Sequence, residues 1–302
     1  MRWTEDEWLV LAEGGNVPRE TVDAPRCAER EPVARSFDTD RSSDADRSFD
    51  RDRGFKREAP AGEKRNSGET LTRDEFEGET LHLDYQSLRI PMDGRYLSLR
   101  ERPGWLRMYG RSGLASRFSQ TLIAHRMTEY NLYAETCLDF EPEVFKQMAG
   151  LIFLYDTDNY LYLHISHDED VGKCITLLKA ENRKYEYLTD YVPIEPGKDV
   201  ILGLTVKGTE AQFSYGYRCL REDEETAPGH ARRQDREKGG GADRGLQKIG
   251  PRINASFLSD EACEEGWFTG AMVGICCQDL TGFGRHADFD WFELRAGSGQ
   301  NP

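Results

Sequence analysis

The chain has 302 residues, of which 37% are hydrophobic and 31% charged, and its mean hydropathy is −0.72. These values are low for a chain of this length that is folded throughout, which predicts that part of it is unfolded. The net charge of −15 opposes unaided binding to nucleic acid or to an anionic membrane, because their phosphates would be repelled. A neutral ligand such as a sugar is compatible with this charge.

The sequence gives no sign of a membrane or secreted protein. No apolar run approaches the roughly 18 to 20 residues of a membrane span, and the start MRWTEDEWLV lacks the basic and apolar parts of a secretion signal. The seven cysteines are irregularly spaced, with Cys276 and Cys277 adjacent, unlike a disulfide framework. We therefore expect a cytoplasmic protein with reduced thiols. The scattered histidines predict no zinc site.

Two charged stretches divide the chain. Residues 26–73 contain the tandem hexamers SFDTDR, SSDADR and SFDRDR, and they bury too little apolar surface to fold. This predicts a disordered linker, the alternative being an interaction tail. Residues 222–244 (EDEETAPGHARRQDREKGGGADR) predict a disordered insertion inside the folded region. The folded domain is then expected over residues 74–296, with a short tail at 297–302.

The folded region has the pattern of an all-β protein, with short aromatic and β-branched runs between turns. The run LYAETCLDF at 132–140 alternates and predicts a half-buried strand, and 150–168 predicts a hairpin around the polar turn 156–159. Only EPEVFKQM at 141–148 suggests a turn of helix. Further strands are expected at 105–109, 120–127, 173–179, 185–191, 199–207, 211–217, 271–277 and 287–295.

Seven phrases of the folded region carry a family resemblance: LRIP (88–91), YLSLRERPGWLRMYG (96–110), SRFSQTLIAHRM (116–127), FEPEVFKQMAGLIFLYDTDNYLYL (140–163), ASFLSDE (255–261), WFTGAMVGICCQD (267–279) and ADFDWFEL (287–294). In this order they resemble the β-sandwich that follows the five-bladed propeller in family 43 β-xylosidases. The resemblance implies a concanavalin A-like, jelly-roll sandwich of two antiparallel sheets.

The opening residues extend this resemblance. WTEDEWLVLAEGGNVPRETVDAP (3–25) is similar to the closing strand of the propeller and its linker, so residues 1–25 are expected to be a remnant of the propeller. The resemblance then implies that the catalytic domain is missing and the chain is truncated. Two departures from the family pattern are the long hexamer-repeat linker and the 222–244 insertion.

What the resemblance implies for function is a lid. In the family the two catalytic carboxylates lie in the propeller, and their motifs are absent here, so no catalytic residue and no hydrolysis by the chain alone are expected. A loop of the sandwich places an aromatic side chain at the propeller's sugar pocket, and the matching loop is GWFTG at 266–270. This implies Phe268, with Trp267 and Thr269, as the pocket lid. The alternative is that Trp267 and Phe268 fill the core.

The resemblance also implies the partners: a family 43 propeller, and a xylo-oligosaccharide or arabinose-substituted sugar. Arg117, His125 and Arg126 lie near a strand start and are candidates for the propeller interface, the alternative being salt pairs with the acidic surface. The lid hypothesis further predicts an apolar patch around Trp267 and Phe268 where the propeller docks.

The acidic residues offer only incomplete metal sites. Asp288 with Asp290, or Asp156 with Asp158, supply oxygens for calcium, but neither pair has a full ligand set, so surface and turn roles are favoured and no cofactor is expected. The run ADFDWFEL predicts a final strand whose Asp288, Asp290 and Glu293 face solvent.

Two other functions compete with the lid. An independent carbohydrate-binding module would need an open groove with coplanar aromatics, and the candidates at strand spacing are Tyr160, Tyr162, Tyr185, Tyr187 and Tyr191. A hydrolase with an unrecognised site has the least support, because no acid/base constellation stands out.

Overall fold

The computed structural model describes residues 2–3, 9–10, 70–116, 118–218, 245–264 and 270–297. The chain divides into two compact units, Met1–Ala61 and Gly62–Pro302. In the first, β1 (Arg2–Trp3) and β2 (Leu9–Val10) form an antiparallel pair. The predicted linker up to residue 69 and the insertion at 222–244 lie outside the described residues, as does most of the predicted tail.

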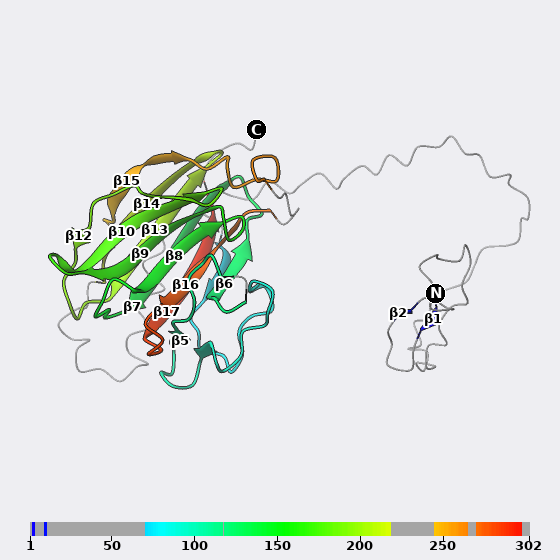
Figure 1. The fold of residues 1–302 in the computed structure, drawn as a ribbon, viewed down its shortest axis with the longest axis horizontal. Helices are drawn as coiled ribbons and strands as arrows, with labels where there is room; N and C mark the ends of the chain where they lie inside the picture. The colour runs from blue at the N-terminus through cyan, green and yellow to red at the C-terminus, as the bar shows by residue number, and fades with distance from the viewer. Residues whose placement is uncertain are drawn as a thin grey trace, which may run out of the picture. The chain divides into compact units, whose positions relative to one another are not determined.

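The second unit is built from two antiparallel sheets (Figure 1). The seven-stranded sheet has the order β11–β10–β9–β8–β16–β6, with β12 beside β10. Its strands are β6 (Thr121–Arg126), β8 (Gln147–Leu154), β9 (Tyr160–Asp168), β10 (Gly172–Glu181), β11 (Lys184–Tyr187), β12 (Val192–Pro193) and β16 (Met272–Asp279).

The eight-stranded sheet has the order β15–β14–β13–β7–β17–β5–β4, with β3 beside β17. Its strands are β3 (Thr70–Asp74), β4 (Leu97–Ser98), β5 (Leu106–Tyr109), β7 (Asn131–Asp139), β13 (Val200–Lys207), β14 (Glu210–Tyr217), β15 (Gln247–Asn254) and β17 (His286–Ala296).

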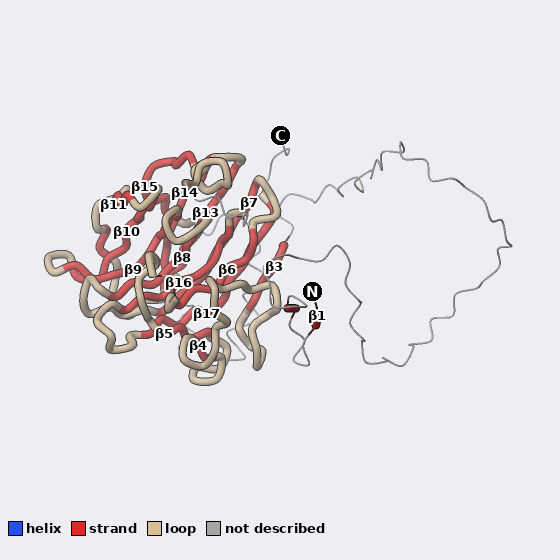
Figure 2. Tube along the Cα trace, turned by 45° about the vertical axis from the view of Figure 1, so that its right-hand side comes forward, coloured by secondary structure: helices blue, strands red, loops and turns tan. Residues whose placement is uncertain are grey.

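The main core lies between the two sheets. Every second residue of the long strands points into it, such as Leu151 and Phe153 of β8 and Leu202 and Leu204 of β13, all buried. Figure 2 shows the strands in red and the connecting loops in tan. No helix occurs within the described residues, so no helix there could cross a membrane. The predicted all-β, two-sheet sandwich is confirmed.

The predicted β8–β9 hairpin is also confirmed. Leu154 pairs with Tyr160, and the N–H of Tyr155 donates to the carbonyl of Asn159 at 3.0 Å, closing the polar turn. The predicted turn of helix at 141–148 is wrong. The segment bends through a single turn in which the N–H of Gln147 donates to the carbonyl of Val144 at 3.0 Å, and Gln147 already belongs to β8.

Four strands of the sandwich were not predicted, namely β3, β4, β12 and β15. β15 has Gly250 at a φ of 71° followed by Pro251, beside a register shift in its pairing with β14, and this irregularity hides the strand pattern in the sequence. β3 pairs with β17, so the sandwich begins at Thr70 rather than at residue 74, and residues 70–73 are not linker.

The polar sides of β7 and β17 are buried, contrary to the prediction of a half-solvated strand for each. Glu135 of β7 is 1% exposed and Asp290 of β17 is 0% exposed. Both strands are central, since β7 lies between β13 and β17, and β17 lies between β7 and the β3 and β5 strands. Long arginine side chains from neighbouring segments cover this outer face.

Candidate functional site

The loop expected to act as the lid leads into β16 at one end of the sandwich. Residues 265–269, and with them Trp267, Phe268 and Thr269, lie outside the described residues. Gly270, which follows the loop, has a φ of 73°, and a Cβ there would lie 3.2 Å from Nη1 of Arg126. A side chain at position 270 would be strained and would crowd the guanidinium, so glycine suits this position.

The segment before the loop is fixed to the same sandwich. Phe257 and Leu258 are buried in the main core, and the N–H of Ala255 donates to the carbonyl of Thr209 at 2.7 Å. The hydroxyl of Tyr155 donates to the carboxylate of Asp260. The residues on both sides of the loop are thus held by packing and hydrogen bonds.

The three expected interface residues separate in the structure. His125 is 5% exposed, stacks on Phe292 at 5.7 Å and meets the ring of Tyr85 edge-on at 4.2 Å, so it is a core residue and the interface prediction for it is wrong. Burial lowers the pKa of His125 to about 4. Arg126, by contrast, is exposed beside Gly270, where a partner can reach it. Arg117 lies outside the described residues.

The acidic residues of β17 are neutralised by arginines. Asp288 lies 2.7 Å from Nε of Arg107 and 2.9 Å from Nη1 of Arg102, and Asp290 lies 2.8 Å from Nη1 of Arg218. Burial alone would raise the pKa of Asp288, but the hydrogen bonds from Arg107 and Arg102 outweigh it and hold the pKa below its ordinary value. Guanidinium groups thus supply the positive charge that a calcium ion would bring.

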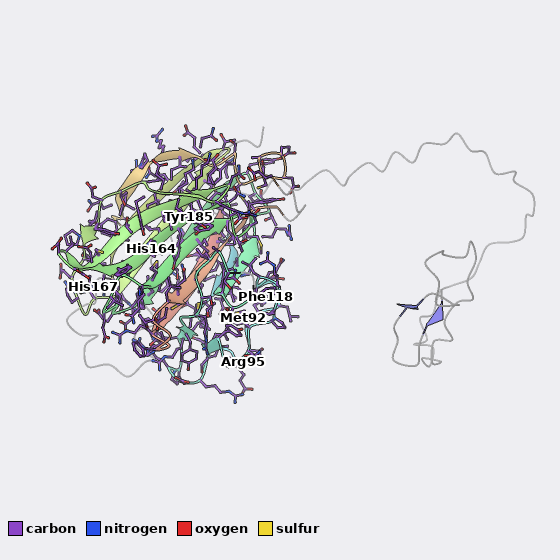
Figure 3. All side chains as sticks on the ribbon, in the orientation of Figure 1. Met92, Arg95, Phe118, His164, His167 and Tyr185 are labelled. Atoms are coloured by element: carbon purple, nitrogen blue, oxygen red, sulfur yellow. The ribbon has the colours of Figure 1, made fainter. Side chains whose placement is uncertain are left out.

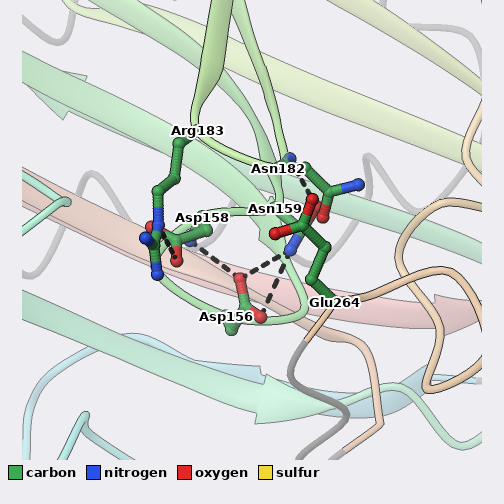
Figure 4. A pocket seen from close by; sticks show the side chains of 6 residues that line it. All are labelled: Asp156, Asp158, Asn159, Asn182, Arg183 and Glu264. Atoms are coloured by element: carbon green, nitrogen blue, oxygen red, sulfur yellow. Dashed lines mark hydrogen bonds and ion pairs between the residues drawn. The ribbon is translucent and has the colours of Figure 1, made fainter.

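The second aspartate pair lines a small polar pocket (Figure 4). Oδ1 of Asp156 accepts hydrogen bonds from the N–H of Asp158 at 2.7 Å and from the amide of Asn159 at 3.0 Å. Asp158 pairs with Nε of Arg183 at 2.9 Å. These contacts give both carboxylates a turn-stabilising role. No group of three or more His, Cys, Asp or Glu suited to a metal occurs among the described residues.

Two turns and the segment before residues 265–269 build this pocket. The N–H of Asn182, in the β10–β11 turn, donates to Oδ1 of Asn159 in the β8–β9 turn at 2.9 Å, which locks the turns together. Glu264 completes the lining, immediately before residues 265–269. Sequence reasoning missed Asn182, Arg183 and Glu264. The Asn-Arg pair between two strand-like runs was the only signal for the turn.

The five candidate tyrosines do not form one platform. Tyr160 and Tyr162 are buried, at 3% and 0% exposed, and the hydroxyl of Tyr162 donates to the carbonyl of Cys276 at 3.1 Å. These two rings pack on the outer face of the seven-stranded sheet within an apolar cluster. Tyr185, Tyr187 and Tyr191 remain, at 53%, 53% and 39% exposed.

The two packed antiparallel sheets define the class of the domain as a concanavalin A-like β-sandwich. The family described as the β-xylosidase C-terminal concanavalin A-like domain, of glycoside hydrolase family 43, matches residues 73–235 and 232–295. The chain therefore belongs to this family.

Similar proteins of known sequence or structure support the same family assignment. The chain is 32% identical over 223 residues to a β-xylosidase of Bacillus subtilis, covering 74% of this chain and 38% of that protein. It is 35% identical over 224 residues to xylosidase/arabinosidase 43B of Humicola insolens, covering 71% and 37%. The crystal structure of a xylan β-1,4-xylosidase from Bacillus halodurans superposes with a TM-score of 0.64 at 30% identity, over 97% of this chain and 45% of that one. The chain spans less than half the length of each.

Proposed function

We propose that this chain is the accessory sandwich of a xylan-degrading family 43 system and closes the sugar pocket of a catalytic propeller with Phe268. The observation that carries the proposal is the family match, which covers the sandwich, while the matched relatives are xylosidases of more than twice the matched length. The fixed residues on both sides of loop 266–270 and the accessible Arg126 beside it support a loop that meets a partner.

The sandwich contributes positioning rather than proton transfer. Hydrolysis by this class needs one carboxylic acid to protonate the leaving oxygen and one carboxylate to activate water, and we assign both to the propeller. The aromatic ring of Phe268 offers a flat apolar surface to the C–H face of a pyranose. Closing the pocket in this way excludes water and strengthens the electrostatic interactions inside it.

We place the protein in the cytoplasm. Cys137, Cys174, Cys276 and Cys277 are buried free thiols in the structure, and buried thiols suit a reducing compartment. Burial raises the pKa of Cys276 to about 12, so this thiol stays protonated and unreactive at neutral pH.

The test measures hydrolysis of aryl β-xyloside and aryl α-arabinofuranoside by the purified chain, alone and mixed with a separately expressed family 43 propeller. We expect no turnover by the chain alone, and turnover in the mixture that falls about tenfold with Phe268→Ala, equivalent to about 1.4 kcal/mol of transition-state stabilisation. Phe283→Ala is the matched control, because Phe283 is 90% exposed beyond the opposite end of β16.

Either of two results would overturn the lid. Turnover by the chain alone would reveal a catalytic site within it. Turnover in the mixture that is equally insensitive to Phe268→Ala and Phe283→Ala would show that the loop does not reach the pocket. If neither the chain alone nor the mixture hydrolysed the substrates, but the chain bound xylo-oligosaccharides, an independent carbohydrate-binding module would be favoured.

A further inference from the structure

Three exposed tyrosines gather on the edge of the seven-stranded sheet farthest from β6. Tyr185 pairs with Ala180 and Tyr187 with Leu178, and both partners belong to the apolar cluster on the outer face, so both tyrosines project from that face. The ring of Tyr191 lies 5.9 Å from that of Tyr187 at an interplanar angle of 58°. β11 is an edge strand, which leaves these rings open to solvent (Tyr185 is labelled in Figure 3).

Buried residues of the outer-face cluster pack next to the exposed tyrosines. Tyr160 of β9, two strands further into the sheet than β11, is 3% exposed, and it packs with Ala180 and Leu178 in the same cluster. Tyrosine presents a large amphipathic surface with only two side-chain torsions, so ordering it against a ligand costs little entropy. An aromatic surface held in this way suits a ligand with both C–H faces and hydroxyl groups.

The polar pocket adjoins these tyrosines along the chain. Asn182 and Arg183 lie in the turn that leads into β11, and Asn159 directly precedes Tyr160. The side-chain amide of Asn182 and the carboxylate of Glu264 make no hydrogen bond with any described residue, so both are available to a ligand's hydroxyl groups. Each carries donor or acceptor atoms that a sugar ring can use.

The surroundings disfavour an anionic ligand. The adjoining polar pocket is lined by the carboxylates of Asp156, Asp158 and Glu264 against the guanidinium of Arg183, within a chain of net charge −15. A phosphate or a uronic acid would meet this excess of negative charge, whereas a neutral sugar would not.

We propose that Tyr185, Tyr187 and Tyr191, with Asn182 and Glu264, form a second sugar-binding surface that holds the neutral main chain of xylan. The surface does not include the proposed lid residues Trp267, Phe268 and Thr269. Its assignment to xylan, rather than to another neutral polysaccharide, rests on the proposed function; the existence of the surface does not.

The register of the sheet relates the two sites. Tyr185, Ala180, Tyr160, Leu154, Met272 and Arg126 form one row of paired residues across the sheet. Five strand spacings separate β11 from β6, which is roughly 24 Å at about 4.8 Å each. A xylan chain on the tyrosines therefore lies at the same end of the sandwich as Arg126 and Gly270.

The test titrates the intact chain with xylohexaose by isothermal calorimetry. We expect binding that the double variant Tyr185→Ala/Tyr187→Ala weakens at least tenfold and that Glu264→Gln weakens about threefold. Tyr130→Ala is the matched control, because Tyr130 is 59% exposed but lies just before β7 of the other sheet. Thermal unfolding of each variant checks the fold, which exposed substitutions should leave intact.

The outcomes separate this proposal from the lid. Absence of binding of both xylohexaose and cellohexaose by the intact chain, or equal xylohexaose binding by the double variant, would overturn the surface. Cellohexaose binding as tightly as xylohexaose would overturn its assignment to xylan. In the mixture with the propeller, the double variant should leave aryl β-xyloside turnover unchanged, because that substrate has a single sugar, whereas Phe268→Ala should reduce it.

Discussion

The outer faces of the two sheets are covered by opposite kinds of chemistry. On the eight-stranded sheet, the carboxylates of Asp288 and Asp290 are buried against arginines, and the guanidinium of Arg102 lies 3.7 Å from the ring centre of Trp105. On the seven-stranded sheet, the outer face is an apolar cluster that includes the buried Tyr160 and Tyr162. The first face satisfies its own charges, whereas the second ends in exposed aromatic rings, which is why we place ligand binding on the second.

Removing one charge from the first face should have the largest effect on stability. Asp290 is fully buried and pairs with Arg218, whose side chain is 11% exposed. Asp290→Ala leaves a guanidinium without its buried partner, and we expect it to lower the free energy of unfolding by about 3–5 kcal/mol in urea denaturation.

The control for this prediction is Asp93→Ala. Asp93 makes a similar 2.7 Å pair with Arg95, but its side chain is 49% exposed and Arg95 is 73% exposed, so no measurable change is expected. If both variants unfolded at the same urea concentration, the Asp290–Arg218 pair would not be buried from solvent as the structure indicates.

Acid should weaken the apolar face before the charged one. His164 is 1% exposed, stacks on Tyr162 at 4.7 Å, and burial lowers its pKa to about 4 from an ordinary value near 6.5. Between these two values the unfolded chain binds the proton and the folded chain does not, so stability falls as pH falls from about 6.5 towards 4. The expected loss from this one residue is roughly 3 kcal/mol at pH 4.

The charged face differs because the pKa of Asp288 is lowered, so its contribution is retained above its ordinary pKa and is lost only as pH falls through the lower folded value. Urea denaturation at pH 7, 5.5 and 4.5 checks this. In His164→Phe the free energy of unfolding should fall less steeply with pH, because the contribution of His164 is removed. The contribution of His125, whose pKa is also about 4, should remain. An unchanged slope in His164→Phe would contradict the assignment.

The sequence predicts one side of the central strands and misses the other. Alternation in 132–140 correctly places Leu132, Ala134 and Leu138 in the core, because apolar burial is local to the strand. The burial of Asp290 depends instead on Arg218, which is far away in the chain, and buried Glu135 accepts a hydrogen bond from the hydroxyl of Tyr133. Alternation therefore reports which side faces the core, but not whether the polar side is covered.

The candidate site shows the same limit. The seven family phrases are sufficient to identify the sandwich family, whereas the lid loop that they suggest stays a prediction. They could not show that His125 turns inward against Phe292, or that Asn182 and Glu264 meet in one pocket. Both depend on strand register and on turn geometry, which set the direction of a side chain and leave little trace in single residues.

The smallest effect tests how the buried tyrosines support the exposed ones. Tyr162→Phe keeps the ring but removes the hydrogen bond to the carbonyl of Cys276, so we expect a loss of about 1 kcal/mol in urea denaturation. Tyr185→Phe, at an exposed ring, should be neutral. If Tyr162→Phe were equally neutral, packing alone would hold the base of the aromatic surface. If it lowered stability and also weakened xylohexaose binding, the hydroxyl of Tyr162 would contribute to the order of Tyr185 and Tyr187 as well as to the fold.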